Sequence, residues 1–254
     1  MIGVYCTSKK PEYWEKLYNS LSQNKTEFNL CITGPNPPIH DLPKNFKYIQ
    51  TNVKPTQCFF IAACNTDGDL LYQIGDDMTF TPGLLDSLAN TSQTYHKNII
   101  VATTRHGTIT NQFAIYELDP ETKQTNYLDQ IKFPIPYPAC PMMYRETFMN
   151  IGIDKGYLGI WWGMDIACEL FFSRRGQIVI DYNHNIEEYD VTNNEPRLTD
   201  YTRADYAYWL CMWTQVIDGK FQPRERRLQP IEPLVYSSDV LTVSQGITDP
   251  SRWD

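Results

Sequence analysis

The sequence lacks any long hydrophobic segment. No stretch approaches the roughly 18 consecutive apolar residues that a membrane-spanning helix requires. Residues 1–11 also lack the basic-then-apolar order of a signal peptide. We therefore expect a soluble, cytoplasmic protein without a membrane span.

Positive charge is scarce as well. Lysine and arginine number 22 against 30 aspartates and glutamates, which gives a net charge of −8. This balance weighs against a nucleic-acid partner. Phosphate-bearing small ligands remain open, because a bound metal ion supplies local positive charge inside an acidic protein.

Paired cysteine motifs are absent too. The seven cysteines are scattered, and none has the C-x-x-C spacing of a zinc site or a redox site. Cys58 and Cys64 flank an apolar segment, in which a free thiol behaves as a small hydrophobic side chain. We expect a reducing compartment.

Apolar residues are plentiful: 42% of the chain is hydrophobic and 13% is aromatic. This composition excludes disorder and is sufficient for one substantial core. Strand-like and helix-like patterns alternate over the first hundred residues, which predicts an α/β fold with a mostly parallel sheet. The expected strands are 1–6, 28–33, 46–50, 69–74 and 99–103, with helices from Pro11, Gln57 and Pro82.

The second half is less regular. Residues 112–127 alternate as in a hairpin or meander, and the four prolines in 133–141 predict a stiff connector that belongs to no sheet. The remaining expectations are helices at 160–175 and 205–216, a strand at 178–181 and a surface tail from Pro223.

Asp76 and Asp77 directly follow the expected strand 69–74 and precede Pro82-Gly83, which opens a helix. Seen alone, such a pair is typical of a turn or a helix cap. Open α/β sheets, however, bind ligands at the carboxyl ends of their strands. The segments 7–9, 34 and 75–77 are therefore the candidate site.

The stretch 68–83 resembles the GT-A glycosyltransferases, especially the large family 2 group. In those enzymes the acids form a DxD-type motif that holds a divalent cation against the diphosphate of a nucleotide-sugar. The resemblance implies that Asp77 binds Mn²⁺ or Mg²⁺ and that Asp76 contacts the ribose or the metal. Such cations prefer carboxylate and phosphate oxygens, and they neutralise the charge of the departing diphosphate.

A second stretch supports the resemblance. The family carries Gly-Glu-Asp at a helix start, twelve residues before a helix-ending glycine, and Met164 to Gly176 has that spacing. The resemblance implies that Asp165 is the general base that takes the proton from the acceptor hydroxyl. Trp161 and Trp162 either stack on an acceptor sugar or belong to the core.

The segment 139–152, with Arg145, is similar to the family's link between the two motifs. The family also places nucleotide contacts after its first strand, which implies a donor role for Thr7, Ser8 and Lys9. It often has a metal-binding histidine after the acceptor helix. That position implies that His184, in an expected polar loop, is a metal ligand or otherwise a surface residue.

Three departures stand against this pattern. Met164 replaces the family's glutamate, Gly34 stands where an acid often reads the base, and the usual Arg-Asn pair is missing around 57–60. They keep open a non-catalytic sugar- or nucleotide-binding module with a decayed site.

The resemblance implies one GT-A domain, 1–222, with a nucleotide-sugar half at about 1–105, an acceptor half at about 106–222 and an extension at 223–254. The implied donor is a nucleotide-sugar, with UDP-sugars favoured over GDP- and dTDP-sugars. The implied acceptor is a glycan or glycoconjugate.

We expect an inverting transferase, and a retaining one remains the alternative of the same fold. A nucleotidyltransferase would need a Gly-rich phosphate loop, whereas residues 1–11 contain only Gly3. A glycosidase would need two opposed carboxylates instead of an adjacent pair.

Overall fold

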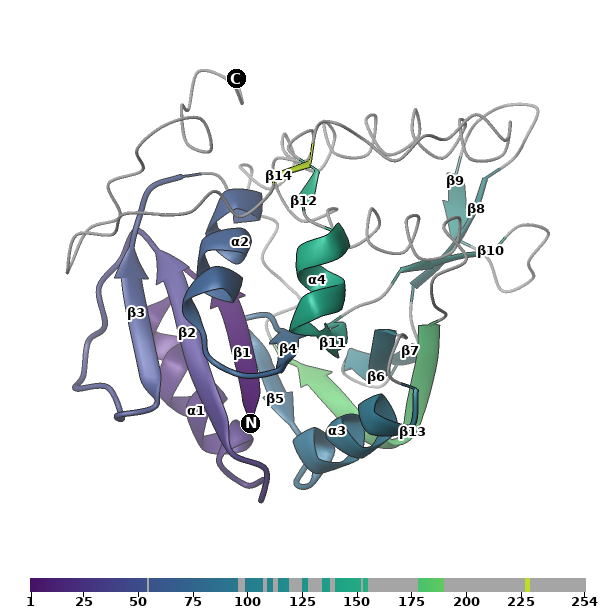
Figure 1. Cartoon of the computed structure of the whole chain (residues 1–254), viewed down its shortest axis with the longest axis horizontal. Helices are drawn as coiled ribbons and strands as arrows, with labels where there is room; N and C mark the ends of the chain where they lie inside the picture. The colour runs from purple at the N-terminus through teal and green to yellow at the C-terminus, as the bar shows by residue number, and fades with distance from the viewer. Residues whose placement is uncertain are drawn as a thin grey trace.

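Four parallel strands form the first part of the central sheet, in the order β3-β2-β1-β4 (Figure 1). The computed structural model describes residues 1–53, 55–95, 99–106, 109–111, 114–118, 125–127, 134–137, 140–151, 153–154, 178–189 and 227–228. The strands are β1 (Ile2–Thr7), β2 (Phe28–Gly34), β3 (Phe46–Gln50) and β4 (Leu70–Gln73). All four confirm predicted strands.

The sheet continues from β4 in the order β11-β6-β13-β5, and β7 pairs with β6. Strand β6 runs parallel to β13, whereas β11 is antiparallel to β4 and β6, and β5 is antiparallel to β13. The predicted α/β fold with a mostly parallel sheet is therefore confirmed. The added strands are β5 (Met78–Phe80), β6 (Ile99–His106), β7 (Ile109–Asn111), β11 (Met142–Tyr144) and β13 (Ile178–Glu188).

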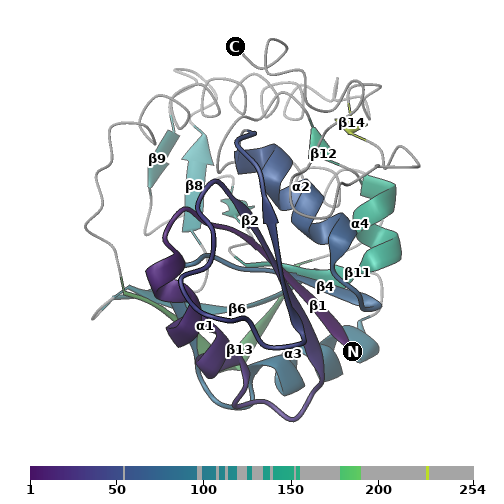
Figure 2. The ribbon, with the colours of Figure 1, turned by 90° about the vertical axis from the view of Figure 1, so that its left-hand side faces the viewer.

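Helices cover both faces of the sheet. Figure 2 shows α2 and α4 on one face and α1 and α3 on the other. The first helix is preceded by a 3-10 turn, η1, in which Pro11 supplies the fixed φ that suits a helix start. The elements are η1 (Pro11–Tyr13), α1 (Trp14–Leu21), α2 (Pro55–Asn65), α3 (Leu84–Thr94) and α4 (Arg145–Ile151).

Side-chain alternation along β1 divides the core into two layers. Val4 and Cys6 belong to the core cluster that includes residues of α1 and α3. Tyr5 points the other way, with its ring 6.4 Å from Phe59 and 5.8 Å from Phe148. This period of two fixes β1 as a strand buried on both faces. Each fully buried large apolar side chain stabilises the fold by about 1.5–3 kcal/mol.

Arg145, at the start of α4, ties three backbone carbonyls together. Its guanidinium donates hydrogen bonds to the carbonyl oxygens of Ala63 (3.1 Å), Thr66 (2.6 Å) and Gly68 (2.7 Å). These carbonyls belong to the last turn of α2 and to the link that leads into β4. Arg145 therefore fixes the amino end of β4. This is a structural role for the segment 139–152, which resembles the family's link between its two motifs.

A second sheet corrects one prediction. Residues 134–137 were expected in a connector outside any sheet, but they form β10, which pairs antiparallel with β8 in the order β10-β8-β9. Strand β10 is an edge strand, so the amide groups that proline lacks are not needed on its outer side. The predicted meander is confirmed by β8 (Ala114–Leu118) and β9 (Thr125–Tyr127), with β10 spanning Pro134–Tyr137.

The expected helices 160–175 and 205–216 lie outside the described residues. So does the extension 223–254, except for β14 (Arg227–Leu228), which pairs antiparallel with β12 (Ile153–Asp154). In the described part of the chain, no helix has the length and apolar character that crossing a membrane requires.

Candidate functional site

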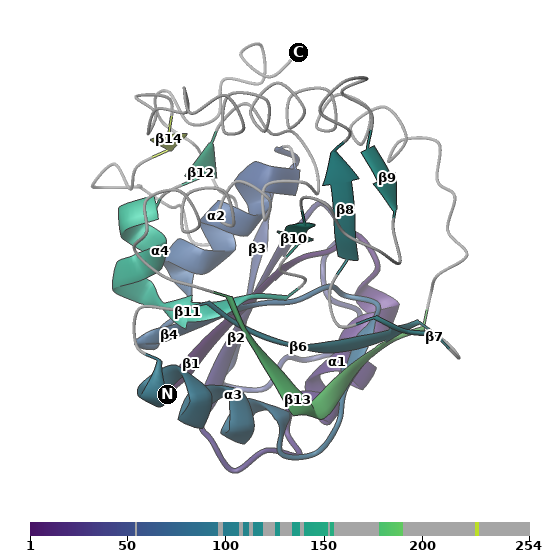
Figure 3. The same cartoon turned by 90° about the vertical axis from the view of Figure 1, so that its right-hand side faces the viewer.

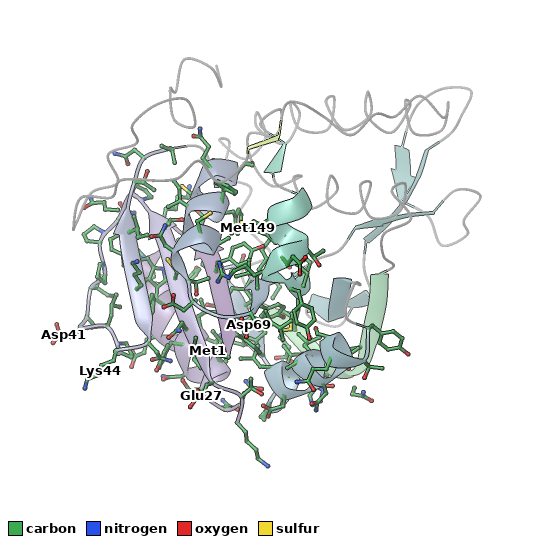
Figure 4. The ribbon with its side chains drawn as sticks, viewed as in Figure 1. Met1, Glu27, Asp41, Lys44, Asp69 and Met149 are labelled. Carbon is green, nitrogen blue, oxygen red and sulfur yellow. The ribbon has the colours of Figure 1, made fainter. Side chains whose placement is uncertain are left out.

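The candidate site lies where β1 and β4 end. Figure 4 labels Met1 and Asp69, which precede these two strands, and the site is at their opposite ends. Asp76 and Asp77 occupy the link between β4 and β5, and the Asp77 carbonyl accepts a hydrogen bond from the backbone N–H of Tyr189 (3.0 Å). The sheet therefore brings the acidic pair to its carboxyl edge, as the sequence predicts.

Ser8 holds Asp76 from the end of β1. Its hydroxyl donates a 2.6 Å hydrogen bond to Asp76 Oδ2 and accepts bonds from Trp14 Nε1 (2.7 Å) and the Lys10 backbone N–H (3.0 Å). Ser8 is only 5% exposed. The predicted donor residues Ser8 and Asp76 are thus in direct contact across 68 residues of sequence.

Asp76 is held in an environment that opposes its charge. Burial raises the pKa of its carboxyl group to about 6; the Ser8 hydrogen bond and the Lys10 charge lower it, and the Asp77 charge raises it. At pH 7 Asp76 is mostly ionised. A cation close to the pair would favour this ionised form further.

A sulfur cluster shapes the turn that carries the acids. The Gly75 backbone N–H donates to Met78 Sδ (3.3 Å), and Cys140 Sγ donates to the same sulfur (3.2 Å). Cys140 has a φ of 50°, a conformation that few non-glycine residues adopt. Met78 therefore links the turn at Gly75 to the segment entering β11.

Two residues at the end of β13, Glu188 and Tyr189, lie beside the turn that carries the acids, and the sequence does not predict them there. Tyr189 donates its hydroxyl to the Asp76 carbonyl (3.3 Å), and its ring lies 5.4 Å from Tyr13 and 3.5 Å from Lys16 Nζ. Glu188 pairs in register with Met78. The only signal in the sequence is their position near the end of a strand, because no motif includes them.

His184 lies in a strand, which corrects the expected loop. It belongs to β13, in a bulge between Asp181 and Asn185, and Figure 3 shows β13 bending beside α3. A Cβ atom at Gly83 would lie 3.1 Å from His184 Nε2. His184 precedes Tyr189, whose N–H bonds to the Asp77 carbonyl, by five residues. Its role as a metal ligand stays a prediction.

Gly34 has a steric reason that explains its departure from the family pattern. A Cβ atom there would lie 1.7 Å from the Ser8 carbonyl oxygen. The Ser8 N–H also donates to the Thr33 carbonyl (2.9 Å), so the segment after β1 lies directly against the end of β2. No side chain, acidic or otherwise, fits at position 34.

The remaining predicted residues have different placements. Thr7 ends β1, and Lys9 follows Ser8 with its carbonyl accepting a hydrogen bond from Asn36 Nδ2 (2.6 Å). Ser8 bonds to Asp76 directly, and the donor roles of Thr7 and Lys9 stay predictions. Asp165, Trp161 and Trp162 lie outside the described residues.

The acidic pair suits one kind of metal binding. Among the described residues, no three His, Cys, Asp or Glu side chains come close enough together to hold a metal ion. Mg²⁺ is commonly held by one or two carboxylates, with its other ligands from substrate phosphates and water. Asp76 and Asp77 fit that arrangement, in which the ligand completes the coordination.

By sequence, the chain matches no protein-family profile and no curated protein. Solved structures do match its fold. Staphylococcus aureus TarS (residues 1–349) in complex with UDP-GlcNAc superposes with a TM-score of 0.54 at 10% identity, over 80% of this chain and 64% of that one. GalNAc-T7 with UDP, GalNAc and Mn²⁺ superposes with a TM-score of 0.62 at 11% identity, over 85% and 49%.

This chain has the GT-A fold. The expected fold is therefore confirmed, together with the position of the acids at its carboxyl edge. The GT-A chain described here spans less than two thirds of the length of TarS 1–349 and about half that of GalNAc-T7.

Proposed function

We propose that this protein is a metal-dependent glycosyltransferase that moves a sugar from a nucleoside-diphosphate sugar to an acceptor hydroxyl. One observation carries the proposal: Asp76 is fixed by Ser8 beside Asp77 at the carboxyl edge of a GT-A sheet. The fold similarity to structures containing UDP-GlcNAc or UDP with Mn²⁺ supports a UDP-sugar as the donor.

In this proposal Asp77 holds Mn²⁺ or Mg²⁺, and Asp76 binds the nucleotide with its carboxylate oriented by Ser8. The bound cation neutralises the charge that develops on the leaving diphosphate. Thr7 and Lys9, at the end of β1, contact the nucleotide in this proposal. His184, in the β13 bulge, is the proposed further protein ligand of the metal.

For the acceptor side, we propose that Asp165 takes the proton of the attacking hydroxyl, so that the reaction inverts the anomeric configuration. A carboxylate in hydrogen-bond reach of the hydroxyl serves as general base in such a step. Trp161 and Trp162 supply aromatic faces on which an acceptor sugar stacks. Analysis of the product's anomeric configuration separates this reaction from a retaining one.

Isothermal titration of UDP with and without Mn²⁺ tests the donor site. The native protein should bind UDP more tightly with Mn²⁺. Asp77→Asn should weaken that binding by more than the roughly 10–100-fold typical of changes around a metal ligand. Asp69→Asn is the matched control, because Asp69 is exposed and precedes the opposite end of β4 (Figure 4).

If Mn²⁺ does not strengthen the binding of UDP, GDP or dTDP, the enzyme proposal fails. The alternative is then a non-catalytic sugar- or nucleotide-binding module. A hydrolysis screen over UDP-, GDP- and dTDP-sugars then identifies the donor. Asp165→Asn should keep metal-dependent UDP binding and lose transfer. Equal loss of binding in Asp77→Asn and Asp165→Asn would contradict the assigned roles.

A further inference from the structure

The hydroxyl of Ser8 has no remaining hydrogen-bonding capacity. A serine hydroxyl carries one proton and two acceptor lone pairs. Trp14 Nε1 and the Lys10 N–H occupy the acceptor side, and the proton goes to Asp76 Oδ2 at 2.6 Å. The two incoming N–H groups therefore determine the direction in which the Ser8 proton points.

Trp14 is itself held rigidly. It opens α1, is 2% exposed, and its ring lies 5.8 Å from Phe46 and 5.2 Å from Tyr48. Its indole N–H cannot turn away from Ser8 without disturbing this aromatic group. Donors locked by packing in this way hold the groups that they contact in a preorganised geometry.

We propose that Trp14 is a positioning residue for Asp76: its indole N–H fixes the Ser8 hydroxyl, which in turn sets the orientation of the Asp76 carboxylate. That this orientation matters for donor binding rests on the proposed function. The chain of contacts runs from the α1 core, through the end of β1, to the acidic pair at the end of β4.

A simpler role for Trp14 makes different predictions. If Ser8 only satisfied the buried indole N–H, Trp14→Phe would change stability and leave Asp76 in place. Phenylalanine keeps an aromatic ring against Phe46 and Tyr48 and lacks only the N–H donor and the second ring. The positioning role requires that loss of the N–H changes the orientation of Asp76.

A double-mutant cycle on Mn²⁺-dependent UDP affinity separates the two roles. Trp14→Phe and Ser8→Ala should each weaken binding about tenfold, as loss of a supporting hydrogen bond does near metal sites. The double variant should bind no more weakly than Ser8→Ala alone, because Trp14 acts through Ser8. If the double variant bound UDP about a hundredfold more weakly than the native protein, the two substitutions would act independently and the proposal would be overturned. A native affinity in Trp14→Phe would overturn it as well.

Phe46→Leu is the control for packing. It loosens the contact with the Trp14 ring, and no hydrogen bond to Ser8 is removed. This variant should lose stability in urea and keep the native UDP affinity. A tenfold loss of affinity in Phe46→Leu would assign the effect to packing and overturn the positioning role.

Crystal structures of the native protein and Trp14→Phe without ligand keep this test independent of the proposed function. A rotated Asp76 carboxylate in the variant supports positioning, even if the native protein binds no nucleotide and the donor proposal fails. An unmoved carboxylate with the 2.6 Å Ser8 bond intact would overturn it.

Discussion

Asp76 follows the carboxyl end of β4, whereas Asp86, ten residues later, lies in α3 and bonds to the segment before β2. Their surroundings shift the two pKa values in opposite directions. Asp86, in the first turn of α3, accepts bonds from the backbone N–H groups of Lys25 (3.1 Å) and Thr26 (2.7 Å) and from Thr26 Oγ1 (2.6 Å). Desolvation, the largest influence, raises its pKa, but the bonds from Thr26 and Lys25 together lower it.

Asp76 has one such hydrogen bond from a side chain, from Ser8, and a carboxylate neighbour at Asp77. Its pKa is raised to about 6, chiefly by burial. Asp86 thus joins α3 to the segment before β2 through hydrogen bonds that stabilise its charge. Asp76, at the carboxyl edge of the sheet, lies in an environment that disfavours its charge. Perturbed groups of this kind concentrate at functional sites, often at a cost in stability.

The largest expected effect is at the carboxyl edge, where Gly34→Ala should lower the free energy of unfolding by about 3 kcal/mol. Its Cβ would overlap the Ser8 carbonyl oxygen, a backbone atom that cannot turn away. Gly75→Ala is the control, because its Cβ meets the ends of the Asp77 and Met78 side chains at 3.0 Å. Urea unfolding measures both, and equal losses would show that Gly34 has no special steric role.

At the amino edge, Arg145→Met should cost about 2.5 kcal/mol, since it leaves three carbonyls without their charged donor. Arg145→Lys keeps the charge and one donor group, and it should recover about a third of that loss. Thermal and urea unfolding provide the measurement. An Arg145→Lys variant as stable as the native protein would contradict the need for the three-way contact.

Asp86→Ala should cost about 1.5 kcal/mol at pH 7 through the lost bonds to Lys25 and Thr26. Because the pKa of Asp86 is lowered, its stabilisation is present above the unfolded value near 4 and disappears as the pH falls through the folded value. Exposed Asp41 (Figure 4) is the control, and Asp41→Ala should change stability by less than about 0.5 kcal/mol.

The smallest effect has the opposite sign. Asp76→Asn should raise the free energy of unfolding by about 1 kcal/mol at pH 7, although it impairs the proposed donor site. With a folded pKa near 6 and an unfolded value near 4, native stability falls as the pH rises from about 4 to 6. The gain of the variant should therefore vanish at pH 4 in urea titrations. A gain unchanged at pH 4 would exclude ionisation as its cause.

Much of the first half was predictable because each strand is a distinct apolar run. Strands β1 to β4 and the helices between them follow from this alternation, and the position of Asp76 and Asp77 follows from the end of β4. Strands β5 and β11 have three residues each, too few to show a period. Strand β10 was not predicted because its prolines are typical of a connector. An edge strand tolerates them, since it needs hydrogen bonds on one side only.

The site itself was only partly predictable. The sequence predicts Ser8 and Asp76 at the carboxyl ends of two strands, but their hydrogen bond and the contact with Trp14 depend on strand order and on how α1 packs. Tyr189 reaches Asp76 because β13 extends beyond the predicted strand to Glu188. The same extension puts His184 in a strand bulge instead of the expected loop. Such contacts depend on register, which a single sequence does not specify.

The antiparallel strand β11 also affects the order of assembly during synthesis. It separates β4 from β6, and its residues follow theirs by at least 36 positions. A nascent chain that has released only β1 to β6 therefore exposes the unpaired edge of β4, which invites pairing with other chains. Pairing with Met142–Tyr144 covers this edge of β4, so until that segment emerges the growing chain needs protection from aggregation there.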